Sequence, residues 1–140
     1  MKSKTLISLS LALVMLFTLA TPALAGPPHR ETLLAVGEPT APTQKSAAQA
    51  THNNTVKVTI VLKGATENQL YYVYVKHVFN STYHEAGSFQ TDGKGNARYR
   101  GFTTDTFSSG DRTLQLFVED SQAPPTSTRF QTSGFELTFK

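Results

Sequence analysis

The alternation of apolar and polar side chains in residues 55–63 is the feature that most constrains the fold of this chain. Val56, Val58, Ile60 and Leu62 occupy every second position, and lysine or threonine stands at most positions between them. A period of two residues places the apolar side chains on one face of a strand. Burial on one face only favours an antiparallel sheet, because the strands of parallel sheets are covered on both faces.

Residues 70–79 predict a second, longer strand. The segment is rich in Tyr and Val, which suit a pleated and half-buried surface. We expect its odd-numbered positions to face the core, because the even-numbered set contains Lys76 and two tyrosines that tolerate water. This orientation would expose Tyr72 and Tyr74 as an outward aromatic pair.

A hairpin is expected to follow. Its turn is the Asp-Gly-Lys-Gly sequence at residues 92–95, in which glycine permits the positive φ angles of a tight reversal. Ala97 and Tyr99 should face the core, whereas Arg98 and Arg100 should face solvent. The complete set of predicted strands is 55–63, 70–79, 87–91, 96–102, 113–120, 129–132 and 135–140.

About seven short strands separated by turn residues predict an all-β fold, an antiparallel Ig-like β-sandwich. The runs Leu-Tyr-Tyr-Val-Tyr-Val and Gly-Ser-Phe-Gln-Thr-Asp-Gly-Lys-Gly-Asn-Ala resemble those of exported immunoglobulin-like modules of bacteria. The chain has no Cys and no Trp, so the disulfide and tryptophan of antibody domains are missing. The resemblance, which spans residues 55–139, therefore implies an architecture and no activity.

The N-terminal segment predicts an export signal. Lys2 and Lys4 precede an apolar run at residues 6–19, and Ala-Leu-Ala at residues 23–25 places small side chains where signal peptidase cuts. The run is shorter than the ~20 residues that span a bilayer as a helix, which disfavours an uncleaved anchor. We expect residues 1–25 to be removed and the protein to be secreted, into the periplasm if the host has an outer membrane.

Loss of the signal changes the meaning of the net charge. The chain has 13 Lys and Arg against 10 Asp and Glu, and two of the lysines belong to the signal. The remaining chain is nearly neutral, so its overall charge gives no reason to expect nucleic acid or an anionic membrane as partner. No second long apolar run follows, so we expect no membrane insertion after cleavage.

Residues 26–54 predict a flexible tail between the signal and a β-sandwich domain at residues 55–140. Prolines interrupt the tail, and Thr, Ala, Gln and Ser dominate residues 40–51, so it lacks the apolar area that would offset the entropy of ordering. The apolar island at residues 33–36 permits a second interpretation. It would form a short strand along a sheet edge, either in the same chain or in a neighbouring copy.

His77, His84 and Glu85 are the residues best suited to bind a transition metal. Their spacing fits no compact metal motif, and the ligand count falls short of the three or four that such sites need. Solvated histidines are therefore the favoured interpretation. The turn at residues 92–96 superficially resembles the start of a calcium loop. Lys94 stands where that loop needs an oxygen ligand, which favours a plain hairpin turn. We expect no metal and no cofactor.

Exposed aromatic and arginine side chains are better candidates for a binding site than for a catalytic one. The chain has no Cys and no Gly-x-Ser-x-Gly motif, so no enzymatic activity is expected. Tyr72 and Tyr74, flanked by Arg98 and Arg100, would suit stacking on a sugar or anchoring a protein. The alternative is that these side chains form cross-strand pairs that only stabilise the sheet.

The first functional hypothesis is a secreted, non-catalytic, monomeric module that binds a protein or a carbohydrate, or that acts in surface structure. The second hypothesis is assembly through strand donation, with residues 33–36 paired to the open edge of a neighbour. The third is a metal-dependent enzyme centred on His77 and His84.

Overall fold

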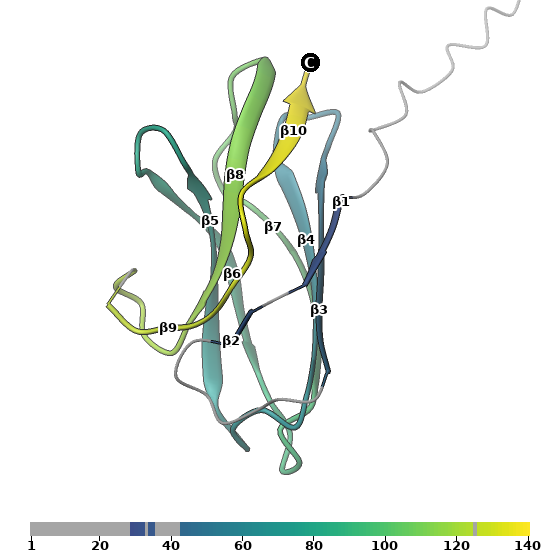
Figure 1. The fold of residues 1–140 in the computed structure, drawn as a ribbon, viewed down its shortest axis with the longest axis vertical. Coiled ribbons are helices and arrows are strands. Elements are labelled where there is room, and N and C mark those ends of the chain that lie inside the picture. The colour runs from purple at the N-terminus through teal and green to yellow at the C-terminus, as the bar shows by residue number, and fades with distance from the viewer. Residues whose placement is uncertain (1–28, 33, 36–42, 125) are drawn as a thin grey trace, which may run out of the picture.

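The computed structural model describes residues 29–32, 34–35, 43–124 and 126–140, which form ten strands and no helix (Figure 1). Every strand pairing is antiparallel. In the part of the chain that is described, no helix has the length and apolar character needed to cross a membrane. The strands are β1 (His29–Thr32), β2 (Leu34–Ala35), β3 (Thr43–Ala50), β4 (Val56–Lys63), β5 (Leu70–His77), β6 (Tyr83–Gln90), β7 (Ala97–Phe102), β8 (Gly110–Glu119), β9 (Thr128–Gln131) and β10 (Phe135–Phe139).

The strands form two sheets. The first sheet has the order β1-β3-β4-β7, and the second has the order β2-β9-β8-β5-β6. The tenth strand also belongs to the second sheet, because β10 pairs with the N-terminal half of β8 while β9 pairs with its C-terminal half. The expected hairpin is wrong, because β6 and β7 do not pair: β6 is an edge strand of the second sheet and β7 is an edge strand of the first, so the turn between them crosses from one sheet to the other.

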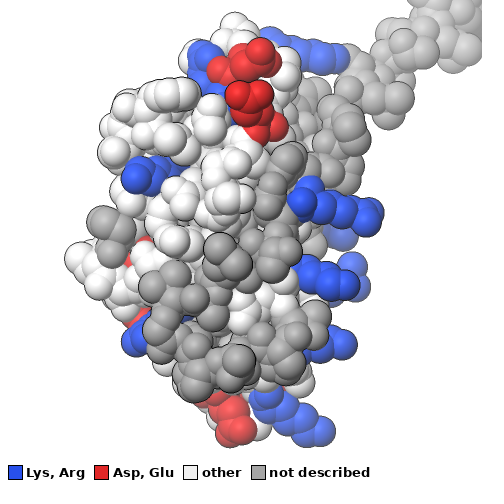
Figure 2. All heavy atoms as spheres, in the orientation of Figure 1, with Lys and Arg blue, Asp and Glu red and all other residues white. Residues whose placement is uncertain are grey.

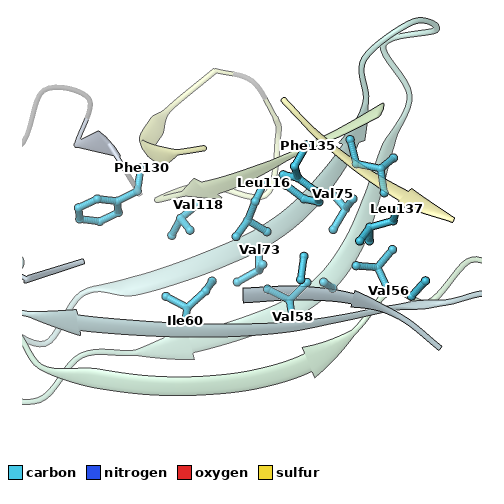
Figure 3. Close-up of a cluster of buried hydrophobic side chains, with 14 of the residues drawn as sticks. Val56, Val58, Ile60, Val73, Val75, Leu116, Val118, Phe130, Phe135 and Leu137 are labelled. Carbon is cyan, nitrogen blue, oxygen red and sulfur yellow. The ribbon is translucent and has the colours of Figure 1, made fainter. Parts of the chain in front are cut away.

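The core lies between the two sheets, as in a β-sandwich. Val56, Val58, Ile60 and Leu62 of β4 are completely buried, as the alternation in the sequence predicts. Figure 3 shows side chains of β4 directed toward side chains of the second sheet. The buried side chains of that sheet include Tyr71, Val73, Val75, Leu114, Leu116, Val118, Phe130, Phe135, Leu137 and Phe139.

Most of the predicted strands are confirmed, but β6 is longer than expected. It begins at Tyr83 rather than at residue 87. The register of β5 and β6 shifts between Val73 and Tyr74, which leaves Ala86 as an extra residue in β6. Such a bulge interrupts the alternation that identifies a strand in the sequence. Edge strands also tolerate polar residues, and the first residues of β6 are mostly polar.

The expected flexible tail is wrong for Thr43–Ala50, which forms the eight-residue strand β3. β3 pairs with β4 along its whole length, and Ser46, Ala48 and Ala50 are buried against the core. These side chains are small, so they give little apolar signal in the sequence, and backbone pairing with β4 supplies much of the order.

For the apolar island at residues 33–36, the prediction of a short strand along a sheet edge is confirmed in part. Leu34 and Ala35 form β2, which pairs with β9 of the same chain opposite Gln131 and Phe130. The predicted signal at residues 1–25 and the tail residues 26–28, 33 and 36–42 lie outside the described residues.

Candidate binding face

Arg98 and Arg100 project from the outer face of the first sheet, as predicted, and they have basic neighbours there. In the register of β4 and β7, Arg98 lies opposite Val61 and Arg100 lies opposite Thr59. Both arginines are exposed. Side chains directly opposite each other on neighbouring strands share one face of a sheet, so the outward lysines of β4 belong to the same surface.

The same surface continues across β3 and β1. Lys45 of β3 lies opposite Val61, and Arg30 of β1 lies opposite Ala47. Figure 2 shows a column of Lys and Arg side chains on the side of the molecule where β1, β3 and β4 lie in Figure 1. We call this surface the basic face and define it by six residues from four strands: Arg30, Lys45, Lys57, Lys63, Arg98 and Arg100.

On the three longer strands of the basic face, no Asp or Glu side chain offsets the positive charge. The other outward positions of β3, β4 and β7 hold Ala, Gln, Thr, Val and Phe, and none holds Asp or Glu. The ion pairs His84–Asp105 and Arg129–Asp120 both lie away from this face. The six cations therefore meet solvent without an opposite charge from these strands.

Asp92 is an acidic residue beside this surface, where it lines a hollow together with Lys63 and Arg98. Its carboxylate is already engaged in its own turn. The Oδ1 atom accepts hydrogen bonds from the backbone N–H groups of Lys94 and Asn96, each at 2.8 Å. These two bonds lower the pKa of the Asp92 carboxyl, and the bond from Asn96 has the larger effect. The carboxyl is therefore held in its charged form.

Three open hollows follow one another along β4 on this side of the molecule. The first includes Thr55 and Lys57, the second includes Lys57 and Thr59, and the third includes Val61 and Lys63. Their volumes are about 510, 180 and 470 Å³. None is a closed cavity, so this surface suits a ligand that lies across it better than a small molecule that is engulfed.

Phe102 is the exposed aromatic side chain of the basic face. It is 53% exposed and lies opposite Lys57 at the C-terminal end of β7. It also lines the first hollow, together with Gln49 and Asn53. An aromatic ring beside a cation and amide groups provides apolar, charged and hydrogen-bonding contacts in one place.

Tyr72 and Tyr74 lie on the second sheet, on the opposite side of the molecule from Arg98 and Arg100. The prediction that the arginines flank the tyrosines is therefore wrong, because β5 and β7 belong to different sheets. The expected exposure is also wrong for Tyr74, which is 6% exposed. Its hydroxyl donates a hydrogen bond to the Gln122 carbonyl at 3.0 Å, so the loop between β8 and β9 covers it.

Tyr74 forms part of an aromatic cluster rather than a binding strip. Its ring packs edge-on against Tyr83, which in turn packs edge-on against Phe117. The ammonium of Lys76 lies over the rings of Tyr83 and Phe117, at 5.6 and 5.8 Å from their centroids. Burial raises the pKa of Tyr74, with a smaller contribution from Glu85. Tyr72 is half-buried beside this cluster.

The structure does not assemble His77, His84 and Glu85 into one site. The Nδ1 atom of His84 lies 3.0 Å from an oxygen of Asp105, and its ring packs on Phe107. Glu85 is exposed on β6 opposite Tyr74, on the other face of the strand. Among the described residues, no group of three or more His, Cys, Asp or Glu side chains is placed to hold a metal ion.

His77 is half-buried, and its Nδ1 atom is buried without a hydrogen-bond partner among the described residues. Burial lowers the pKa of His77, and the nearby Arg112 and His84 lower it further. The ring is therefore neutral near pH 7. It acts as a packing element against Phe79 at the end of β5.

The four lysine and arginine residues missed by sequence analysis are Arg30, Lys45, Lys57 and Lys63. Lys45 and Arg30 fall in the segment that the sequence predicts to be a flexible tail. The outward direction of Lys57 and Lys63 is visible in the alternation of residues 55–63. The sequence does not reveal that β1, β3, β4 and β7 are neighbours in one sheet, which puts all six on one surface.

The class of protein is set by the fold: an all-β protein with two antiparallel sheets in a sandwich-like arrangement. The chain matches no protein-family model, and no curated protein and no solved structure shows significant similarity to it.

Proposed function

We propose that this protein is a secreted, non-catalytic binding module with an immunoglobulin-like β-sandwich, and that it binds an acidic partner through the basic face. Export is supported by the basic start, apolar run and small residues of segment 1–25. The immunoglobulin-like type is supported by two antiparallel sheets whose edge strands β6 and β7 are joined by a turn that crosses between the sheets. The module acts as a monomer outside the cytoplasm.

The observation that carries the proposal is the grouping of six cations on one face of a four-stranded sheet. The exported chain is nearly neutral, so this grouping reflects where the charges lie rather than how many there are. A surface of one sign attracts ligands of the opposite sign, speeds their encounter and excludes partners of like charge.

The absence of catalysis is supported by the contents of the basic face. Its outward positions on β3, β4 and β7 include no Cys, His, Asp or Glu, and the two such groups that line the hollows, His52 in the first and Asp92 in the third, lie toward opposite ends of β4 and form no pair. A general base or a nucleophile activated by one would need such a group within hydrogen-bond reach. The hollows are open to solvent and would not exclude water from a reaction.

Binding of anionic probes to charge-reversed variants tests the proposal. R98E/R100E reverses two charges on the basic face, and K94E/K140E reverses two exposed charges outside it, so both variants change net charge equally. We expect R98E/R100E to weaken binding to immobilised polyglutamate and dextran sulfate by at least about tenfold. K94E/K140E should stay within about twofold of the parent, because rim or distant charges act only through screened long-range fields.

The measurement is the apparent Kd by biolayer interferometry at low and raised salt, with far-UV circular dichroism to check folding. Equal losses in the two variants would mean that only net charge matters, and the basic face would then be no binding site.

A further inference from the structure

The basic face is organised as a track along β4. Its floor is formed by the short side chains of Thr59 and Val61, in the middle of the strand. Lys57 and Lys63 stand at the two ends of the same outward row, about 20 Å apart at the usual rise of a strand. The three hollows follow the same line, so the surface favours an extended ligand over a compact one.

Cations stand on both sides of this floor. Arg98 and Arg100 lie on the β7 side, directly opposite Val61 and Thr59. Lys45 lies on the β3 side, also opposite Val61. An extended ligand over β4 would meet positive charge on either side and at each end, which suits a polymer that carries anionic groups at regular intervals.

The uncharged groups along the track suit a sugar polymer. Gln49 and Asn53 line the first hollow, and Asn96 lines the third. Side-chain amides both donate and accept hydrogen bonds, as sugar hydroxyls require. Phe102 adds an exposed ring at one end, on which the apolar face of a sugar ring would pack.

We propose, on the basis of the function proposed above, that the ligand of the basic face is a linear acidic polysaccharide, bound lengthwise along β4 through its carboxylate or sulfate groups. Phe102 packs on a sugar ring at one end of the track. Arg98, Arg100 and Lys45 hold the acidic groups along its middle.

Single-stranded nucleic acid is a poorer fit, because it is held by successive bases stacked on several aromatic side chains. The basic face offers one exposed ring on β3, β4 and β7, that of Phe102. An anionic membrane is also a poorer fit, because surface binding combines cations with inserted apolar side chains. Among the residues whose side chains are described, the other large apolar ones that are exposed, Leu70, Val78 and Phe79, belong to β5 and the loop after it, away from this face.

The test compares probes of matched length: alginate for carboxylate groups, dextran sulfate for sulfate groups, and uncharged dextran, polyglutamate and single-stranded DNA as alternatives. Anionic phospholipid vesicles are a further alternative. We expect alginate or dextran sulfate to bind more tightly than every alternative, and the tighter of the two to identify the acidic group. R98E/R100E should weaken that binding by at least about tenfold, and K94E/K140E by less than about twofold.

F102A separates a polysaccharide from other polyanions. We expect it to weaken polysaccharide binding by about 2- to 10-fold and to leave polyglutamate binding unchanged. Tighter binding of polyglutamate, DNA or vesicles, or an F102A variant that binds polysaccharide like the parent, would overturn this inference while the basic face stayed a binding site. Failure of R98E/R100E to differ from K94E/K140E on any probe would instead overturn the proposed function.

Discussion

The Tyr99 hydroxyl on β7 donates a hydrogen bond to the Ala86 carbonyl on β6. Because β7 is an edge of the first sheet and β6 is an edge of the second, this bond fastens the two sheets at their shared side. The Tyr99 ring also stacks on Phe89 at a centroid distance of 5.2 Å. Burial raises the pKa of Tyr99, in keeping with a phenol enclosed between the two edges.

Removing this hydroxyl should destabilise the protein. Tyr99→Phe leaves the Ala86 carbonyl without its donor, and Ala86 is 2% exposed. We expect a loss of about 1–2 kcal/mol in the free energy of unfolding, measured with urea. Tyr72→Phe is the matched control and should change it by less than about 0.5 kcal/mol. Equal effects of the two substitutions would show that the bond contributes nothing specific.

The Tyr99 hydroxyl fits because Gly101, two residues further along the same strand, has no Cβ. A Cβ added at Gly101 would lie 2.1 Å from the hydroxyl and 2.4 Å from the Ala86 carbonyl oxygen. We expect Gly101→Ala to destabilise the protein by about 1–3 kcal/mol, because backbone has to shift. A Cβ at Gly93 meets nothing within 4 Å, so Gly93→Ala should be nearly neutral. Thermal unfolding of the two variants side by side decides the matter.

The Asp92 turn should lose stability in acid. The pKa of Asp92 is lowered by its bonds to the Asn96 and Lys94 N–H groups, so its folded-state pKa lies below the ordinary value of 3.8. The carboxylate therefore stabilises the fold above that value, and the contribution is lost as pH falls through the lower, folded-state pKa. Asp92→Asn keeps an acceptor oxygen without the charge. In urea titrations, the difference in unfolding free energy between parent and variant should shrink as the pH falls from about 5 to about 2. A constant difference would contradict this.

Glu119 should matter through its oxygens. It is completely buried, accepts hydrogen bonds from the Ser127 N–H at 3.0 Å and the Thr128 hydroxyl at 2.6 Å, and so holds the loop between β8 and β9. We expect Glu119→Ala to cost about 2–3 kcal/mol, and Glu119→Gln less, because the amide can still bond to both groups. Glu136→Ala on the exposed face of β10 is the control and should be near neutral. Denaturant midpoints that fell equally for all three would refute the assignment.

The place of β3 in the core can be tested with two neighbouring alanines. Ala48 is 4% exposed and faces inward, whereas Ala47 faces the basic side. Ala48→Asp would bury an unpaired charge, and we expect it to cost more than about 3 kcal/mol or to abolish cooperative unfolding. Ala47→Asp should be tolerated. If both variants unfolded like the parent, β3 would not be part of the folded unit in solution.

The sequence was informative wherever large aliphatic side chains alternate. The inward sets of β4 and β10 could be predicted because each strand buries one face, and the period of two shows directly in residue types. The inward side chains of β8 alternate in the same way, although Phe117 and Glu119 on its other face are buried as well. β3 was missed because its inward residues are Ser and Ala. The start of β6 was missed because a bulge breaks the alternation.

The candidate site was predictable only in part, for a reason of topology. Local patterns give the direction of Arg98 and Arg100, but they do not say which strands are neighbours. The burial of Tyr74 was equally hidden, since it depends on a loop that is 48 residues further along the chain. Surfaces built by several strands emerge only once the order of the sheet is known.

The gathering of six like charges has a consequence for the unliganded protein. Each cation of the basic face repels the others, so electrostatic repulsion destabilises the folded state more than the unfolded chain. Dissolved salt screens this repulsion, but it also screens the attraction between the basic face and an anionic polymer. Rising ionic strength should therefore increase the free energy of unfolding of the unliganded protein and, at the same time, lower its affinity for the ligand.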